Sequence, residues 1–248
     1  MSVWDRYEQR IAARGRTKRE AHKRIEQARL LRDLPDSLSY NGILLNGNPQ
    51  YVAIIDTTDA SVKDIHSLPN ERLIHGGLVD WEESKWLITS LDAHNELYDS
   101  GTLTRCNHLL KWKDDDGNVQ ERWCIIEDGT KYLIGEKDGS IDHNTVMTIG
   151  DARLALTIAK DDATKKFKRG TRFIIDDVDA DEALAYEITK SNRLFNLYDD
   201  IGIYRFILNE VVLTDDDNMD IRVADYKSRG FKEPVTDPEE IKRTGVYI

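Results

Sequence analysis

Over most of the chain, apolar and polar residues alternate in short runs, which is the pattern of β-strands rather than of helices. The clearest stretch is 103–126, LTRCNHLLKWKDDDGNVQERWCII, where two apolar runs flank the polar segment 113–118. Asp116-Gly117 lies within this segment, and Gly adopts φ > 0 without steric cost. We therefore predict a β-hairpin with arms at 103–112 and 119–127.

Other runs of β-branched and aromatic residues predict further strands, separated by turn residues. In the first half these are 42–45 and 51–56 around Asn46-Gly47, then 85–91 and 131–135. In the second half they are 153–159, 171–175, 184–189 and 203–213. Two segments carry no strand pattern: 57–81, which we expect to be a long and functional loop, and the Gly-containing linker 135–144.

The N-terminal residues have a helical period instead. Trp4, Tyr7 and Ile11 recur at helical spacing until Gly15 interrupts them. Thr17 and Glu20 form a capping box that predicts the start of a second helix, which ends before a proline at 35. That helix places a narrow apolar face on one side, made of Ala21, Ile25, Ala28 and Leu31. Such a face fits an arm that docks on a neighbouring subunit, and it equally fits a helix lying along its own domain.

These patterns predict a mainly β protein: one or two small β-barrel or sandwich domains with an N-terminal α-helical arm. We assign a basic helical arm to 1–34 and a β domain containing the WKDDDGN hairpin to 35–140. A second β domain follows at 141–213, and an extended polar tail at 214–248.

Composition supports a soluble globular protein, since 40% of the 248 residues are hydrophobic and 33% are charged. No apolar run approaches the roughly 18 residues needed to span a bilayer, so we expect neither membrane insertion nor secretion. The two cysteines, Cys106 and Cys124, lie on opposite arms of the predicted hairpin. They could form a disulfide bond in an oxidising compartment, but we favour the interpretation that both are buried free thiols.

The net charge of −11 is unevenly distributed. Residues 1–34 contain ten Lys and Arg against five acidic residues, which leaves a net charge of −16 on residues 35–248. A basic arm on an acidic body suits contact with an acidic partner or with a second copy. Nucleic-acid binding by the arm is an alternative, although its bases are interleaved with acids and the body would repel a polyanion.

Motifs for catalysis or for cofactor binding are not evident, and we predict no catalytic, cofactor or metal residues. The six histidines do not follow the spacing of metal-binding motifs. His75 lies in a glycine-containing loop, where we expect a solvent-exposed histidine rather than one in an active site. Asp114, Asp116 and Asn118 match the first calcium-loop positions, but the glycine and the twelfth residue do not. We interpret these aspartates, and those at 215–217, as turn residues that bond the nearby backbone.

Three stretches resemble a known protein family. They are MSVWDRYEQRIAARGRTKRE at the start, VDWEESKW through KYLIGE in the middle, and the late set TRFIIDD, LAYEITK and IYRFILNEVVLTDDDN with the run 222–227. The chain is similar to a virion structural family encoded in the head–tail region of tailed phages and prophages of Gram-positive bacteria. The hairpin with Lys111-Trp112 and Arg122-Trp123-Cys124 carries most of this resemblance, and 172–176 is similar to a strand of small β-barrel head-closure proteins.

The resemblance implies a neck component of the virion, a head-closure (stopper) or adaptor subunit of the head–tail connector, with no enzymatic activity and no cofactor. Its implied partners are further copies in a six- or twelve-fold ring, the portal or adaptor and tail proteins, and genomic DNA passing without sequence-specific binding. We predict a subunit interface at Trp4, Tyr7, Arg10, Ile11 and Arg14. The alternatives are a tail-tip or baseplate component that binds the host surface through loop 57–81, and a cell-wall hydrolase.

Overall fold

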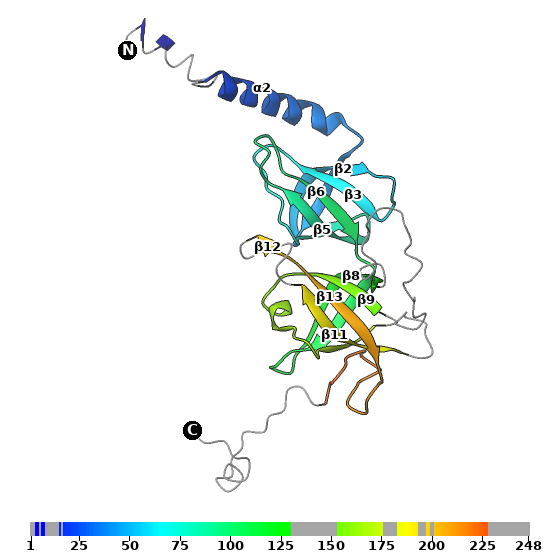
Figure 1. Ribbon diagram of the computed structural model, residues 1–248. Helices are drawn as coiled ribbons and strands as arrows, with labels where there is room; N and C mark the ends of the chain where they lie inside the picture. Colours follow the sequence, from blue (N-terminus) through cyan, green and yellow to red (C-terminus); the bar gives the residue numbers. More distant parts are fainter. Residues whose placement is uncertain are drawn as a thin grey trace, which may run out of the picture.

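The computed structural model describes residues 3, 4, 6, 7, 15, 17–129, 153–175, 183–192, 197–198 and 201–227. In this part of the chain the helix α2 (Lys18–Asp33) precedes two barrel-like sheets (Figure 1), which confirms the predicted mainly β fold class. Among the described residues, no helix combines the length and apolar composition that a membrane crossing requires.

Helix α2 (Lys18–Asp33) begins where the capping box predicted, because Thr17 Oγ1 accepts a hydrogen bond from the Glu20 N–H at 3.2 Å. A short 3-10 turn, η1 (Leu34–Asp36), follows with its proline at the first turn. None of the residues of α2 is buried. The helix runs across one end of the first barrel (Figure 1), where Arg19 forms an exposed ion pair with Glu96.

The first sheet closes into an antiparallel barrel with the strand order β1-β2-β3-β6-β5-β4. Its strands are β1 (Tyr40–Leu45), β2 (Asn48–Asp56), β3 (Val62–Ser67), β4 (Leu78–Trp81), β5 (Ser84–Asp92) and β6 (Ser100–Arg105). Alternate residues point inward, so that residues such as Ile43 and Leu45 of β1 join Val52, Ile65 and Leu103 in a buried core.

Two tight hairpins define this barrel. Asn46 and Gly47 link β1 to β2 with φ of 50° and 82°, the positive pair that an Asn-Gly turn predicts. The second turn joins β4 to β5 and directly follows 57–81, the segment that the sequence assigned to a long loop. That assignment is wrong, because 57–81 contributes both β3 and β4 to the barrel.

Within the described ranges the second sheet has seven strands, ordered β10-β11-β13-β9-β8-β7 with β12 paired to β13. They are β7 (His108–Lys113), β8 (Val119–Asp128), β9 (Arg153–Ala159), β10 (Arg172–Ile174), β11 (Ala185–Asn192), β12 (Leu197–Tyr198) and β13 (Ile201–Val211). The hairpin β7–β8 pairs His108 with Cys124 and Lys113 with Val119, which confirms the predicted hairpin. The edge strands β7 and β10 contact each other, so the sheet curls towards a barrel.

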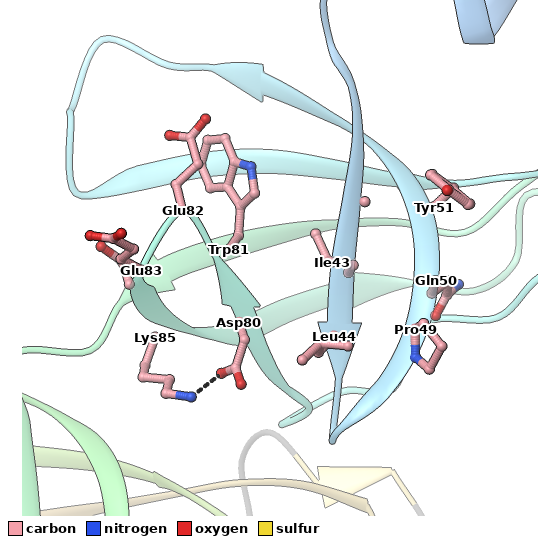
Figure 2. A pocket seen from close by; sticks show the side chains of 12 residues that line it. Ile43, Leu44, Pro49, Gln50, Tyr51, Asp80, Trp81, Glu82, Glu83 and Lys85 are labelled. Carbon is pink, nitrogen blue, oxygen red and sulfur yellow. Dashed lines mark ion pairs between the residues drawn. The ribbon is translucent and has the colours of Figure 1, made fainter.

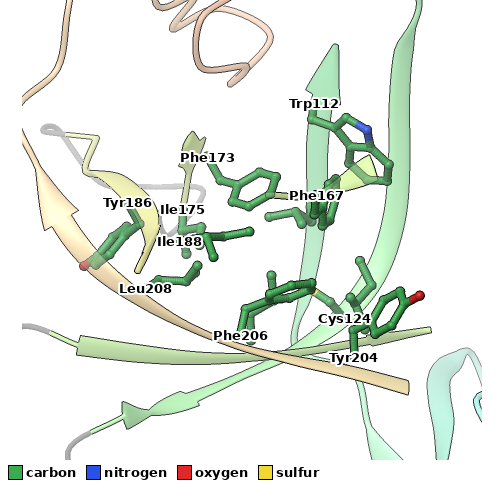
Figure 3. Close-up of a cluster of buried hydrophobic side chains, with 13 residues drawn as sticks. Trp112, Cys124, Phe167, Phe173, Ile175, Tyr186, Ile188, Tyr204, Phe206 and Leu208 are labelled. Carbon is green, nitrogen blue, oxygen red and sulfur yellow. The ribbon is translucent and has the colours of Figure 1, made fainter. Parts of the chain in front are cut away.

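Phe167 organises the core of the second sheet (Figure 3). It follows the 3-10 turn η3 (Thr164–Lys166), and its ring packs edge-on against Trp112 at 4.9 Å and Phe173 at 5.0 Å between centroids. Phe206 of β13 completes the cluster at 5.9 Å. The segment before β10 therefore inserts its aromatic residue between the two edges of the curled sheet.

The division between the two sheets falls at residues 106–107 rather than at the predicted linker 135–144, which lies outside the described residues. The predicted strand 103–112 is broken there: β6 ends at Arg105 in the first barrel, and β7 begins the second sheet. The reason is that β8 pairs with β9, which lies beyond the linker, so the hairpin belongs to the second sheet. The predicted strand 131–135 also lies outside the described residues.

A third apolar cluster joins the two sheets. Leu87 of the first barrel packs with Cys106, Ile125 and Ile203, all of them buried. The backbones also meet here, because a Cβ added to Gly76 would lie 2.0 Å from the carbonyl oxygen of Gly202. Both cysteines are free, buried thiols, as the sequence favoured.

The segment 214–227 is not extended, in contrast to the prediction. Two turns close through a bridge between Asn218 and Val223, and Val223 is fully buried. Lys113 holds this segment from β7, donating to the carbonyl of Tyr226 at 2.9 Å while its ammonium lies over the Tyr226 ring. Residues 228–248 lie outside the described residues.

Candidate functional site

The predicted interface residues divide between described and undescribed positions. Trp4 and Tyr7 are helical and lie edge to face, with ring centroids 6.1 Å apart. Their exposed fractions are 73% and 56%, so the two aromatic rings form an apolar surface facing solvent. Arg10, Ile11 and Arg14 lie outside the described residues.

The apolar face of α2 is also open to solvent. Ile25 is 61% exposed and Leu31 45%, and Ala28 lies exposed between them on the same face. A helix of this length is marginal in water unless an apolar face is packed. Three of the four residues of this face are thus exposed within the single chain, while Ala21 is half-buried.

A groove of about 440 Å³ lies on the outer wall of the first barrel (Figure 2). Leu44 and Tyr51 line it from the β1–β2 hairpin, and Trp81 with Glu82 and Glu83 line it from the β4–β5 hairpin. Tyr51 is 55% exposed and stacks on Tyr40 with ring centroids 5.1 Å apart. The groove thus combines exposed apolar surface with carboxylates.

The turn beside this groove has an unfavourable backbone conformation. Trp81 pairs with Ser84, so Glu82 and Glu83 form a two-residue loop, with φ of 46° and 60°. Such turns normally contain Asn or Gly, because other side chains clash with the backbone at positive φ. Backbone strain of this kind is often retained where a turn contacts a ligand or a partner.

A second hollow, of about 400 Å³, lies on the other side of the same turn and shares Trp81, Glu82 and Ser84 with the groove. Trp86 lines this hollow and is only 5% exposed. Its indole N–H is buried and has no hydrogen-bond acceptor among the described residues. Leu38, which is fully exposed, contributes apolar surface at its rim.

The carboxylates at the groove differ in their partners. Asp80 pairs with Lys85 at 2.6 Å, as the dashed line in Figure 2 marks. Within the described part of the chain, neither Glu82 nor Glu83 has a hydrogen-bond or ion-pair partner, and both side chains are exposed. Two negative charges are therefore available to a basic partner.

One carboxylate in each aspartate-rich turn bonds the nearby backbone, which confirms the prediction for Asp114 and Asp217. The carboxylate of Asp114 accepts hydrogen bonds from the N–H groups of Asp116 and Asn118, at 3.0 and 2.8 Å. Asp217 accepts from the N–H groups of Thr214 and Asp225 and forms a double ion pair with Arg172. These carboxylates hold loops, and the part of the chain that the structure describes contains no cluster of metal-ligating side chains.

His75 is buried, so the prediction of an exposed loop histidine is wrong. Its Nε2 lies 3.1 Å from the Thr89 carbonyl oxygen, next to the contact between Gly76 and Gly202. Burial, above all, and the charge of Arg205 lower the pKa of His75, outweighing the hydrogen bond to Thr89. The residue is a neutral component of the joint between the two sheets.

The groove is not evident in the sequence, because its elements are far apart in the chain. The signal for the β4–β5 hairpin was weak, since Glu-Glu replaces the usual turn residues between VDW and SKW. Tyr51 and Trp81 come together only because β1 pairs with both β2 and β4.

The fold and its surfaces define a β-protein of one closed barrel and one barrel-like sheet, with an exposed, basic N-terminal helix. A family model described as the YomX C-terminal domain matches residues 108–179. The matched segment begins at the first residue of β7, so it lies in the second sheet and covers less than a third of the chain. YomX is a phage-type protein, and the match points to a phage origin. No curated protein and no solved structure gives a significant match.

Proposed function

We propose that this protein is a structural, non-enzymatic component of a phage particle: a subunit of the ring that closes the head or adapts the portal to the tail. The observation that carries this proposal is the solvent-exposed apolar surface of Ile25, Ala28 and Leu31 on α2, because apolar surface left open in its own chain is available to a partner. The phage-type match and the resemblance of the sequence to head–tail connector proteins supply the setting.

Charge supports the same assignment. The arm carries ten basic residues, whereas the body has a net charge of −16, so one subunit's arm is attracted to the next subunit's body. An interface from arm to body is heterologous, and such interfaces generate rings when the rotation closes. An acidic wall around a channel would also let DNA slide through without adhering.

The test is the pair Ile25→Glu and Leu31→Glu in the full-length chain. Because both residues are exposed, the free energy of unfolding should change by less than about 0.5 kcal/mol. Sedimentation velocity should nevertheless show loss of the oligomer, whereas the conservative pair Ile25→Leu and Leu31→Met should assemble like the wild type. Unchanged assembly of the glutamate variant would remove α2 from the interface.

Electron microscopy of the intact particle decides the location. Ring-shaped six- or twelve-fold density beneath the portal is the expected result, with the portal or adaptor and the tail as neighbours. Density at the distal tail tip would instead favour a component that binds the host surface. That second candidate is supported by the groove of Tyr51, Trp81 and Glu82, because aromatic rings beside carboxylates suit recognition of cell-wall sugars.

A further inference from the structure

We propose that the groove on the first barrel is the receptor for the N-terminal segment of a second copy of this chain. This inference rests on the proposed assembly into a ring and identifies the surface that accepts the arm. The groove and the second hollow flank one turn, and together they present the aromatic rings of Tyr51 and Trp81 beside the carboxylates of Glu82 and Glu83.

Charge complementarity selects the occupant. Glu82 and Glu83 lack partners within the described ranges, whereas Asp80 on the same rim is already paired with Lys85, so the two glutamates supply the net negative charge. The N-terminal arm is the basic part of a chain whose remainder is strongly acidic, so it is the segment of a second copy that these carboxylates would attract. Arg6 stands exposed between Trp4 and Tyr7 and would reach the glutamates while the rings enter the hollows.

Apolar surface is exposed to solvent on both the arm and the groove. Trp4 and Tyr7 expose more than half of their surface on the arm, and Tyr51 does so at the groove. Exposed aromatic anchors of this kind are typical of interface hot spots. Helix α2 is about 24 Å long for its 16 residues, so its N-terminal end lies well away from the end that joins its own barrel (Figure 1).

Two features of the receptor have no role within the isolated subunit. The indole N–H of Trp86 is buried without an acceptor in the described residues, and a backbone carbonyl of an inserted segment would satisfy it. The positive φ of Glu82 and Glu83 holds two carboxylates on a turn where Asn-Gly would be more stable. Binding of another chain at the turn and in the hollow would explain both the buried Trp86 N–H and the strained turn.

The decisive variant is Glu82→Asn with Glu83→Gly, which removes both charges and supplies the turn residues that this backbone prefers. It should raise the melting temperature by about 4 °C, because two positive-φ penalties are relieved. In sedimentation velocity it should lose assembly, with at least a tenfold weaker association. Loss of assembly in a more stable protein separates a lost contact from a lost fold.

Matched variants complete the test. Asp64→Asn with Asp116→Asn removes two exposed charges elsewhere and should assemble normally. Trp4→Ala with Tyr7→Ala should lose assembly but keep its groove, so mixing it with the groove variant should give one-to-one pairs that grow no further. Such pairs join the intact arm of one variant to the intact groove of the other.

The outcomes are separable. Normal assembly of the groove variant would overturn this inference and leave the proposed ring intact. A wild-type chain that stays monomeric at all concentrations, and is absent from the particle neck, would overturn the proposed function itself. If the groove variant assembles normally but no longer binds purified cell-wall polymer, the groove is a sugar-binding site. That result would overturn the inference that the groove receives the arm.

Discussion

At the scale of single residues, the strongest polar constraint is the ion pair between Arg172 and Asp217. The Arg172 side chain is 13% exposed and that of Asp217 is fully buried, and the pair fastens 214–227 to β10. Burial alone would raise the pKa of Asp217. The N–H groups of Asp225 and Thr214 and the Arg172 guanidinium outweigh it, so the pKa is lowered below its ordinary value of 3.8.

Because the folded pKa of Asp217 is the lower one, its contribution to stability is present above pH 3.8 and is lost as the pH falls through the folded value. Asp217→Asn should cost about 2 kcal/mol of unfolding free energy at pH 7, because Arg172 keeps Asp225 but loses Asp217, and two backbone N–H groups lose a charged acceptor. Urea unfolding at pH 7 and pH 3 measures this, and the variant should differ less from the wild type at pH 3. The exposed neighbour Asp216→Asn serves as the control, and an equal loss in both would contradict the assignment.

The buried thiols give a second prediction at this scale. Burial raises the pKa of Cys106 from 9.0 to about 12, and burial also raises that of Cys124. Because the thiolate is the reactive species, the folded protein at pH 8 should alkylate Cys106 about a thousandfold more slowly than an exposed cysteine. Mass spectrometry after iodoacetamide treatment should show no modification in the native state and two in urea. Fast native labelling of either thiol would contradict the packing of the joint.

At the scale of elements, the joint between the two sheets depends on glycine. Gly76 has φ of 78° and meets the Gly202 carbonyl, whereas Gly47 has φ of 82° with nothing within 4 Å of an added Cβ. Both Gly→Ala changes carry the same positive-φ penalty of about 1 kcal/mol. Gly76→Ala should cost at least about 2 kcal/mol more, because the two backbones must separate.

Thermal unfolding measures this difference in stability. Limited proteolysis reports whether the connection between the two sheets becomes accessible. In Gly76→Ala the joint should open first, exposing the connection at 106–107 to the protease, while Gly47→Ala should keep it protected. Equal stability of the two variants would show that the joint adjusts without cost.

At the scale of the whole molecule, the polarity between a basic arm and an acidic body predicts assembly that depends on salt. Exposed charges are screened beyond about 10 Å at 0.1 M salt and beyond about 3 Å at 1 M. Raising sodium chloride from 0.05 to 1 M should therefore shift the oligomer towards monomer, leaving the part held by apolar contacts of Trp4, Tyr7 and α2. Sedimentation velocity across this series tests the prediction, and an oligomer unaffected by salt would contradict an electrostatic role for the arm.

The sequence by itself determined the features that neighbouring residues control. Thr17 and Glu20 set the start of α2, Asn46-Gly47 the first hairpin, and the 113–118 turn the hairpin of the second sheet. These follow from the local chemistry of caps and turns, which acts over a few residues and can be recognised without knowing the fold.

Only the tertiary structure decided how the strands are divided between the two sheets and which surfaces pack against each other. The pairing of β8 with β9 moves the hairpin into the second sheet, the pairing of β1 with β4 builds the groove, and the sheet joint buries His75. Arg172 reaches Asp217 across 45 positions of the chain. Such contacts depend on the balance of burial and pairing over the whole fold, so no local pattern of residues encodes them.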